Sequence, residues 1–150
     1  MLVRWLLAAL HLVALGIGLG AVWARARALR GPLDGKGLRR VFQADAVWGL
    51  AAGLWLVTGL LRAFGGWEKG AAYYFQNHVF LTKMALFVLV LALEVWPMVT
   101  LIRWRGAQRK GGVLSTARAR TFALISTVQA ALVVAMVFAA TAMARGLGSR

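Results

Sequence analysis

The chain has 150 residues, 61% of them hydrophobic, and a mean hydropathy of +0.74. A soluble domain needs a more polar surface, so this composition excludes an ordinary water-soluble protein. The formal net charge is +14, and the lack of cysteine excludes disulfides and thiolate metal sites.

Four apolar runs are long enough to cross a bilayer, whose hydrocarbon core of about 30 Å takes about 20 helical residues. Backbone groups inside lipid must be satisfied within each segment, so we expect these runs to be helices. The prediction is an all-α bundle of four transmembrane helices with up-down-up-down topology, short loops and a single integral membrane domain over 1–150. Its spans are about 5–24, 44–64, 78–102 and 121–144.

Basic residues gather in the first and third connections, 25–43 and 103–120. Because Lys and Arg favour cytoplasmic loops, we expect both connections in the cytoplasm and both termini, with the 65–77 loop, outside. This pattern predicts a multi-pass protein of the bacterial cytoplasmic (inner) membrane that contacts the lipid bilayer and binds no nucleic acid. Tryptophans are expected at the interfaces, Trp5 and Trp67 at the outer one and Trp23, Trp48 and Trp104 at the inner one.

A cleaved signal peptide is the alternative interpretation of the first span. Ala24-Arg25-Ala26 resembles a small-x-small cleavage site. The apolar run is longer than a typical signal core, however, and basic residues follow it at once. A retained span is therefore the prediction.

The first span carries His11 on a helix face of small side chains. Such a face either lets a second helix approach, as in the Gly-x-x-x-Gly patterns at 16–20 and 49–53, or makes room for a flat ligand. Haem is the usual flat ligand of buried histidines in four-helix bundles, so both interpretations stay open. By helical spacing, the His11 face includes Ala14, Leu15, Gly18 and Arg25.

The chain has two histidines, His11 and His78, which fall on the first and third spans. We predict that they are the axial metal ligands of a haem b. Lys83 lies deeper in the third span than His78 and is the alternative second ligand. Either Lys83 or Arg62 is expected to neutralise the haem propionates. An interfacial residue beside the 73–77 segment is the other interpretation of His78.

Charged side chains inside the spans cost on the order of 3 kcal/mol or more, so we expect them to have a function. Glu94 and Asp45 lie toward the cytoplasmic side, and we predict that Glu94 pairs with Arg25. Gln129 lies on the fourth span, about 12 Å from its inner end. Pro97 should kink the third helix close to Glu94. This group is either a static ion cluster that fixes helix register or a proton or ion relay.

The sequence lacks the residues that phosphate-binding, metalloprotease and hydrolase sites need. The sequence contains no phosphate-binding loop, no His-Glu-x-x-His motif and no paired carboxylates of the hydrolase type. Methionines at 84, 98, 136 and 143 are scattered along the chain, and we expect them to pack toward lipid.

Three stretches resemble a family of uncharacterised bacterial four-helix integral membrane proteins, a domain of unknown function. They run from His11 to Arg27, from Tyr73 to His78 and from Glu94 to Thr100. The resemblance covers nearly the whole chain and implies the architecture but hardly any mechanism.

A more distant likeness is to the haem-binding protoporphyrinogen oxidase of the HemJ type. That family has a histidine in its first helix and a lysine opening its third, which implies haem-related functions for His11 and Lys83. The chain departs from it at Leu81, where the family has a further histidine.

The leading hypothesis is a small b-type haem protein that passes electrons to or from a quinone or a porphyrin, and so a membrane oxidoreductase if it is an enzyme. The first alternative is a proton- or ion-coupled transporter or channel component that uses Arg25, Asp45 and Glu94. The second is a non-catalytic assembly partner or homo-oligomer whose small-residue faces pack against another membrane protein.

Overall fold

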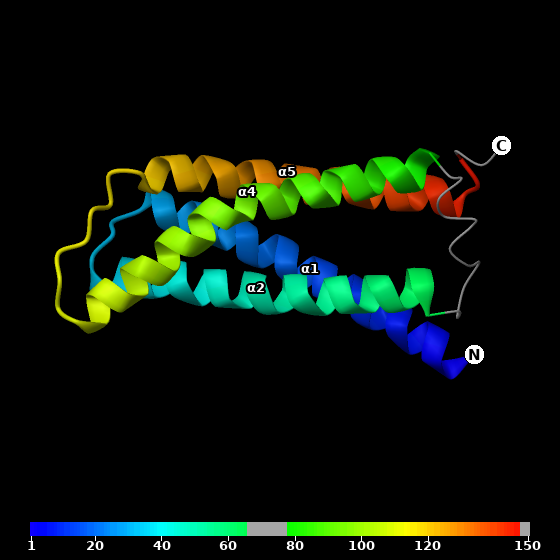
Figure 1. The fold of residues 1–150 in the computed structure, drawn as a ribbon, viewed down its shortest axis with the longest axis horizontal. Helices are drawn as coiled ribbons and strands as arrows, with labels where there is room; N and C mark the ends of the chain where they lie inside the picture. Colours follow the sequence, from blue (N-terminus) through cyan, green and yellow to red (C-terminus); the bar gives the residue numbers. More distant parts are fainter. Residues whose placement is uncertain (66–77, 148–150) are drawn as a thin grey trace.

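The computed structural model describes residues 1–65 and 78–147, which form four helices (Figure 1). These are α1 (Leu2–Arg30), α2 (Gly35–Phe64), α4 (His78–Arg109) and α5 (Ala119–Ala144). Consecutive helices run in opposite directions, so the predicted all-α, up-down-up-down bundle is confirmed (Figure 1). The connections 31–34 and 110–118 lie at one end, here called the basic end. The start of α1 and the end of α5 lie at the other, the terminal end.

Each helix extends beyond the apolar span predicted for it. The predicted connection 25–43 shortens to 31–34, and the predicted 103–120 shortens to 110–118. Arg and Lys are good helix formers, so these helices continue past the apolar runs through the basic residues. At the start of α2, the Asp34 side chain accepts a hydrogen bond of 2.7 Å from an amide N–H of the first turn.

The helices pack in the order α2, α1, α5, α4, so α1 and α5 form the centre of the bundle. In Figure 1, α2 and α4 cross near the basic end and diverge toward the terminal end. One apolar cluster fills the basic end, and it consists of Leu29, Leu38, Val41, Leu101, Trp104, Ala119, Phe122 and Ala123. A second cluster fills the middle, and it consists of Ala21, Val22, Trp48, Val90, Ala130, Val133 and Met136.

All four helices are long and apolar enough to cross a membrane. Many large apolar side chains point outward, among them Leu12, Leu50, Val88 and Phe138, each more than half exposed. Water would penalise such a surface, whereas lipid chains solvate it. Contact with a lipid bilayer therefore follows from the outer surface as well as from the length of the helices.

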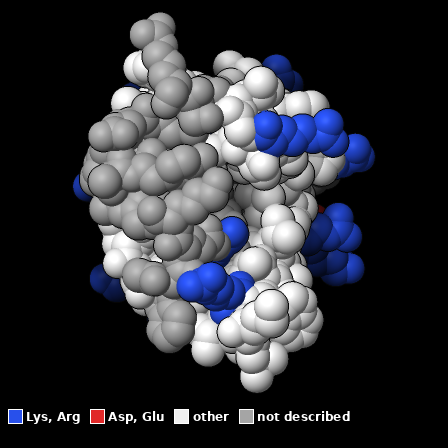
Figure 2. All heavy atoms as spheres, turned by 90° about the vertical axis from the view of Figure 1, so that its right-hand side faces the viewer, with Lys and Arg blue, Asp and Glu red and all other residues white. Residues whose placement is uncertain are grey.

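The described basic residues are few at the terminal end. Viewed from that end, Lys and Arg side chains are scattered around a mostly uncharged surface (Figure 2). Of the predicted 65–77 loop, residues 66–77 lie outside the described residues, and Trp67 lies among them.

The structure overturns one expectation about side-chain placement and bears on one open interpretation. Trp48 and Trp104 are buried in the two core clusters rather than at an interface, whereas Trp5 and Trp23 are exposed. Both Gly-x-x-x-Gly patterns, 16–20 and 49–53, have glycines that face away from the other described helices. A hydropathy pattern shows that a helix is apolar, but not which of its apolar faces meets a neighbour.

Candidate functional site

Arg25 is fully buried and joins all four helices. It donates to Asp45 of α2 at 2.8 Å and to both carboxylate oxygens of Glu94 of α4 at 2.7 Å. It also donates to Gln129 at 2.9 Å and Ser126 at 3.0 Å, both of α5. The predicted contact between Arg25 and Glu94 is therefore confirmed.

These contacts use the whole donor capacity of the guanidinium. Arginine has five N–H bonds, and Arg25 makes five hydrogen bonds, one to Ser126, one to Asp45, two to Glu94 and one to Gln129. The Gln129 amide in turn donates to Glu94 at 2.8 Å and to the Val90 carbonyl at 3.2 Å. Arg25 is thus saturated by the protein itself and has no N–H left for a ligand.

Arg105 is the member of this group that sequence reasoning missed. It donates to Asp45 at 2.7 Å and to the Phe42 carbonyl at 2.9 Å. Two cations therefore balance two carboxylates, and we call Arg25, Asp45, Glu94, Arg105 and Gln129 the charged cluster. A signal was available: Arg105 follows Glu94 by eleven residues, about three helical turns, so the two share one stripe of α4.

His11 lies in the other half of the bundle, on the same face of α1 as Arg25. The predicted face is confirmed for His11, Ala14, Gly18 and Arg25, which are buried, while Leu15 of the same face is partly buried. The Nδ1 atom of His11 lies 2.9 Å from the Thr58 hydroxyl, which itself donates to the Leu54 carbonyl at 2.8 Å. When the single hydroxyl proton goes to that carbonyl, Thr58 accepts from Nδ1–H. In that tautomer the lone pair of the ring is on Nε2.

Residues of α2 fix the position of the His11 ring. Trp55 stacks on it with ring centroids 5.3 Å apart and planes 21° apart. A Cβ atom added at Gly59 would lie 3.1 Å from the His11 Cε1 atom, so only glycine gives the ring this space without a shift. The imidazole is therefore held on one side by a hydrogen bond and on another by an aromatic face.

His11 lines a cavity of about 430 Å³ between the four helices, called here the His11 cavity. Arg62 and Lys83 also line it, so the cavity combines an apolar wall with two cations. Trp55 contributes to the wall, and its buried indole N–H has no hydrogen-bond partner in the described part of the chain. Three methionines expected to face lipid line it instead: Met84, Met136 and Met143.

Two residues predicted to bind haem lie elsewhere. His78 is exposed at the first residue of α4 and does not line the His11 cavity. Gly18 is packed by α2, where an added Cβ would lie 3.4 Å from Trp48 and 3.5 Å from Ala51. The small side chain at position 18 thus serves helix packing. Among residues 1–65 and 78–147, no three His, Asp or Glu side chains gather in a group able to hold a metal ion.

The fold and these contacts define a class: a four-helix membrane protein with an ion cluster buried in its core. Residues 3–148 match the family described as a predicted membrane protein, DUF2214, and the chain belongs to that family. Neither the curated proteins nor the solved structures contain a match. The likeness to the HemJ-type oxidase therefore gains no support from these comparisons.

Proposed function

We propose that this membrane protein binds haem b in the His11 cavity. The observation that carries the proposal is the combination of a buried, oriented imidazole with two cations in one apolar cavity. The volume of about 430 Å³ is within the range of ligand sites in proteins, roughly 300 to 1,000 Å³.

The residues present fit a tetrapyrrole in three respects. His11 has Nδ1 engaged by Thr58, the usual arrangement for a histidine that binds a metal through Nε2. Arg62 supplies a cation for the propionates. Within the described residues the buried Trp55 N–H has no acceptor, and buried donors in proteins normally have one.

Lys83 is the second ligand that the cavity favours, because it lines the same space as His11 and His78 does not. A haem held there supplies one-electron chemistry. We infer that its redox partner is a quinone or a porphyrin that reaches the protein through the bilayer. The protein itself contributes the axial ligand, charge compensation and an apolar wall.

Titration of the purified protein with hemin in detergent tests this proposal. The expected result is saturable binding at one hemin per chain with a shifted Soret band. His11→Ala is expected to abolish that band, whereas His78→Ala, which removes the other histidine outside the cavity, is expected to retain it. Equal spectra for His11→Ala and the unmodified protein would refute the assignment.

We further propose that the basic end faces the cytoplasm of a bacterium, because the predicted orientation follows from the charge of its connections. The lack of cysteine allows a direct test with single cysteines. Ser115→Cys in the basic connection should resist a membrane-impermeant maleimide in intact cells, whereas Ala144→Cys at the end of α5 should react. The reverse pattern would overturn the orientation.

A proton or ion relay through the charged cluster is the second candidate. Its support is the continuous hydrogen-bonded series from Arg105 through Asp45, Arg25 and Glu94 to Gln129. It predicts that Glu94→Gln abolishes ion flux in proteoliposomes and that His11→Ala leaves the flux mostly intact. The haem proposal predicts no such dependence on Glu94.

A further inference from the structure

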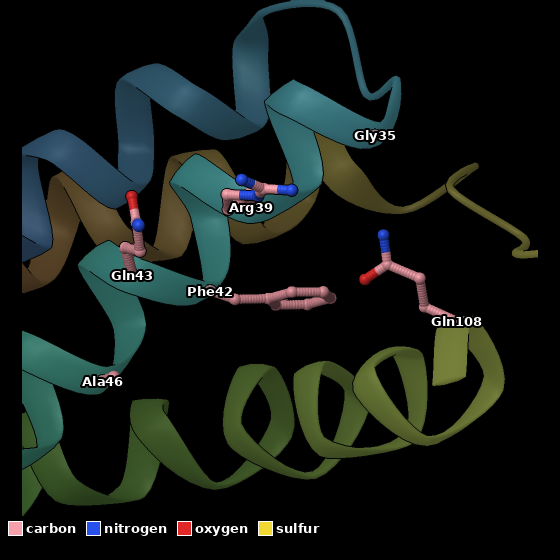
Figure 3. Close-up of a pocket in the computed structure, with 6 residues that line it drawn as sticks. All are labelled: Gly35, Arg39, Phe42, Gln43, Ala46 and Gln108. Atoms are coloured by element: carbon pink, nitrogen blue, oxygen red, sulfur yellow. The ribbon is translucent and has the colours of Figure 1, made fainter. Parts of the chain in front are cut away.

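A groove between α2 and α4 opens at the basic end, and it shares no lining residue with the His11 cavity. It encloses about 450 Å³. In Figure 3 the Phe42 ring extends from α2 toward Gln108 of α4, and Arg39 lies one turn earlier on α2. The residues that line the groove are Gly35, Arg39, Phe42, Gln43, Ala46 and Gln108.

The floor of the groove is fixed by the charged cluster. The Arg105 guanidinium lies over the Phe42 ring at 5.2 Å and also binds the Phe42 carbonyl. Arg105 is in turn held by Asp45. The position of Phe42, and with it the shape of the groove, is therefore set before any molecule enters.

The rim of the groove has exposed polar side chains. Arg39, Gln43 and Gln108 are exposed, and within residues 1–65 and 78–147 their side chains make no hydrogen bond or ion pair. The groove also includes Gly35, the first residue of α2, where the Asp34 carboxylate already caps the helix by accepting from the Gly37 N–H. The cation and the two amides of the rim together suit an anion that also has hydroxyl groups.

The charge around the groove strengthens this preference. Asp45 and Glu94 are neutralised inside the charged cluster, so Asp34 is the acidic side chain left at the basic end of the described chain. The described chain carries many cations in the connections and adjoining helix ends of the basic end: Arg27, Arg30, Lys36, Arg40, Arg103, Arg109, Lys110, Arg118 and Arg120. A neutral or cationic occupant would gain nothing from this field.

The depth of the groove points to a lipid. Arg39 precedes the apolar span that begins near residue 44 by about 7 Å of helical rise, which is headgroup depth. Phe42 and Ala46 continue the groove toward the hydrocarbon, where the exposed Leu50 follows on α2. One molecule with an anionic head and an apolar chain meets both parts, and basic sites between helices are known to bind such headgroups.

We propose that this groove is a binding site for one anionic glycerophospholipid. The phosphate lies at Arg39, the headgroup hydroxyls contact Gln43 and Gln108, and an acyl chain runs over Phe42 and Ala46. The site is separate from the proposed haem site and shares no lining residue with it.

Native mass spectrometry of the full chain, released from micelles with equal phosphatidylglycerol and phosphatidylcholine, tests the proposal. We expect one retained phosphatidylglycerol per chain. Arg39→Gln should reduce its retention about fivefold, the ratio that corresponds to about 1 kcal/mol for one basic residue near an anionic lipid. Arg40→Gln is the matched control, because Arg40 is exposed, adjacent and outside the groove.

A second variant separates shape from charge. Ala46→Trp fills the apolar part of the groove without changing the net charge and should reduce retention as much as Arg39→Gln. Equal losses in Arg39→Gln and Arg40→Gln would show diffuse attraction and overturn the proposal. Full retention in Ala46→Trp, or equal retention of phosphatidylcholine by the unmodified chain, would overturn it as well.

Discussion

The charged cluster and the His11 cavity lie on the same face of α1 and use polar groups in opposite ways. Arg25 donates all five of its N–H groups to acceptors of the protein. The His11 cavity instead sets a buried imidazole and two cations beside open volume. Polar groups packed between helices hold the helices together, whereas polar groups that line a cavity can also contact a ligand. Substitutions in the two regions should therefore separate stability from ligand binding.

Arg25→Met should cause the largest loss of stability. It removes the buried cation and leaves Glu94 and Asp45 without their shared partner, at a cost of about 3–5 kcal/mol. Unfolding in detergent, followed by circular dichroism against temperature or SDS, measures the loss. Arg27→Met, an exposed site on the same helix, is the control and should change little. Equal stability of the two variants would mean that the cluster does not hold the bundle together.

Gly59→Ala should mainly affect the cavity. The new methyl group would lie 3.1 Å from the His11 Cε1 atom and displace the ring. We expect hemin affinity to fall about tenfold, which corresponds to about 1.4 kcal/mol. Gly53→Ala is the matched control on α2, because an added Cβ there meets nothing within 4 Å. If both variants bind hemin as tightly as the unmodified chain, the His11 position does not matter for binding.

Arg105→Gln should have the smallest effect on stability. Arg105 is 32% exposed, and its partner Asp45 keeps its bond to Arg25. The expected loss is about 1 kcal/mol or less, with hemin affinity unchanged. Denaturation of this variant beside Arg103→Gln, an exposed neighbour on α4, isolates the effect. A loss as large as that of Arg25→Met would show that Asp45 depends on Arg105 rather than on Arg25.

Much of the architecture was predictable from the sequence because lipid imposes simple rules. Span length and the lack of charge fixed four helices, and the cost of isolated ions in lipid predicted the contact between Arg25 and Glu94. The buried face of α1 followed from helical periodicity alone. Each of these inferences depends on one helix or on one pair of opposite charges.

The rest depends on how helices cross, which periodicity does not encode. Thr58 and Gly59 are ordinary helical residues until α1 places His11 against them. Arg105 was interpreted as a loop cation because the apolar run ends before it, although α4 continues to Arg109. His78 is a haem-ligand candidate by residue type, and the predicted span already begins at it; that it does not line the His11 cavity is visible only in three dimensions.

The haem content of protein isolated from haem-replete bacterial cells tests the central claim most directly. A pyridine haemochrome assay of the purified chain should give one haem b per chain, and His11→Ala should contain almost none while it remains as folded as His78→Ala. Haem-free protein, or equal haem in both histidine variants, would contradict the assignment of the His11 cavity as a haem site.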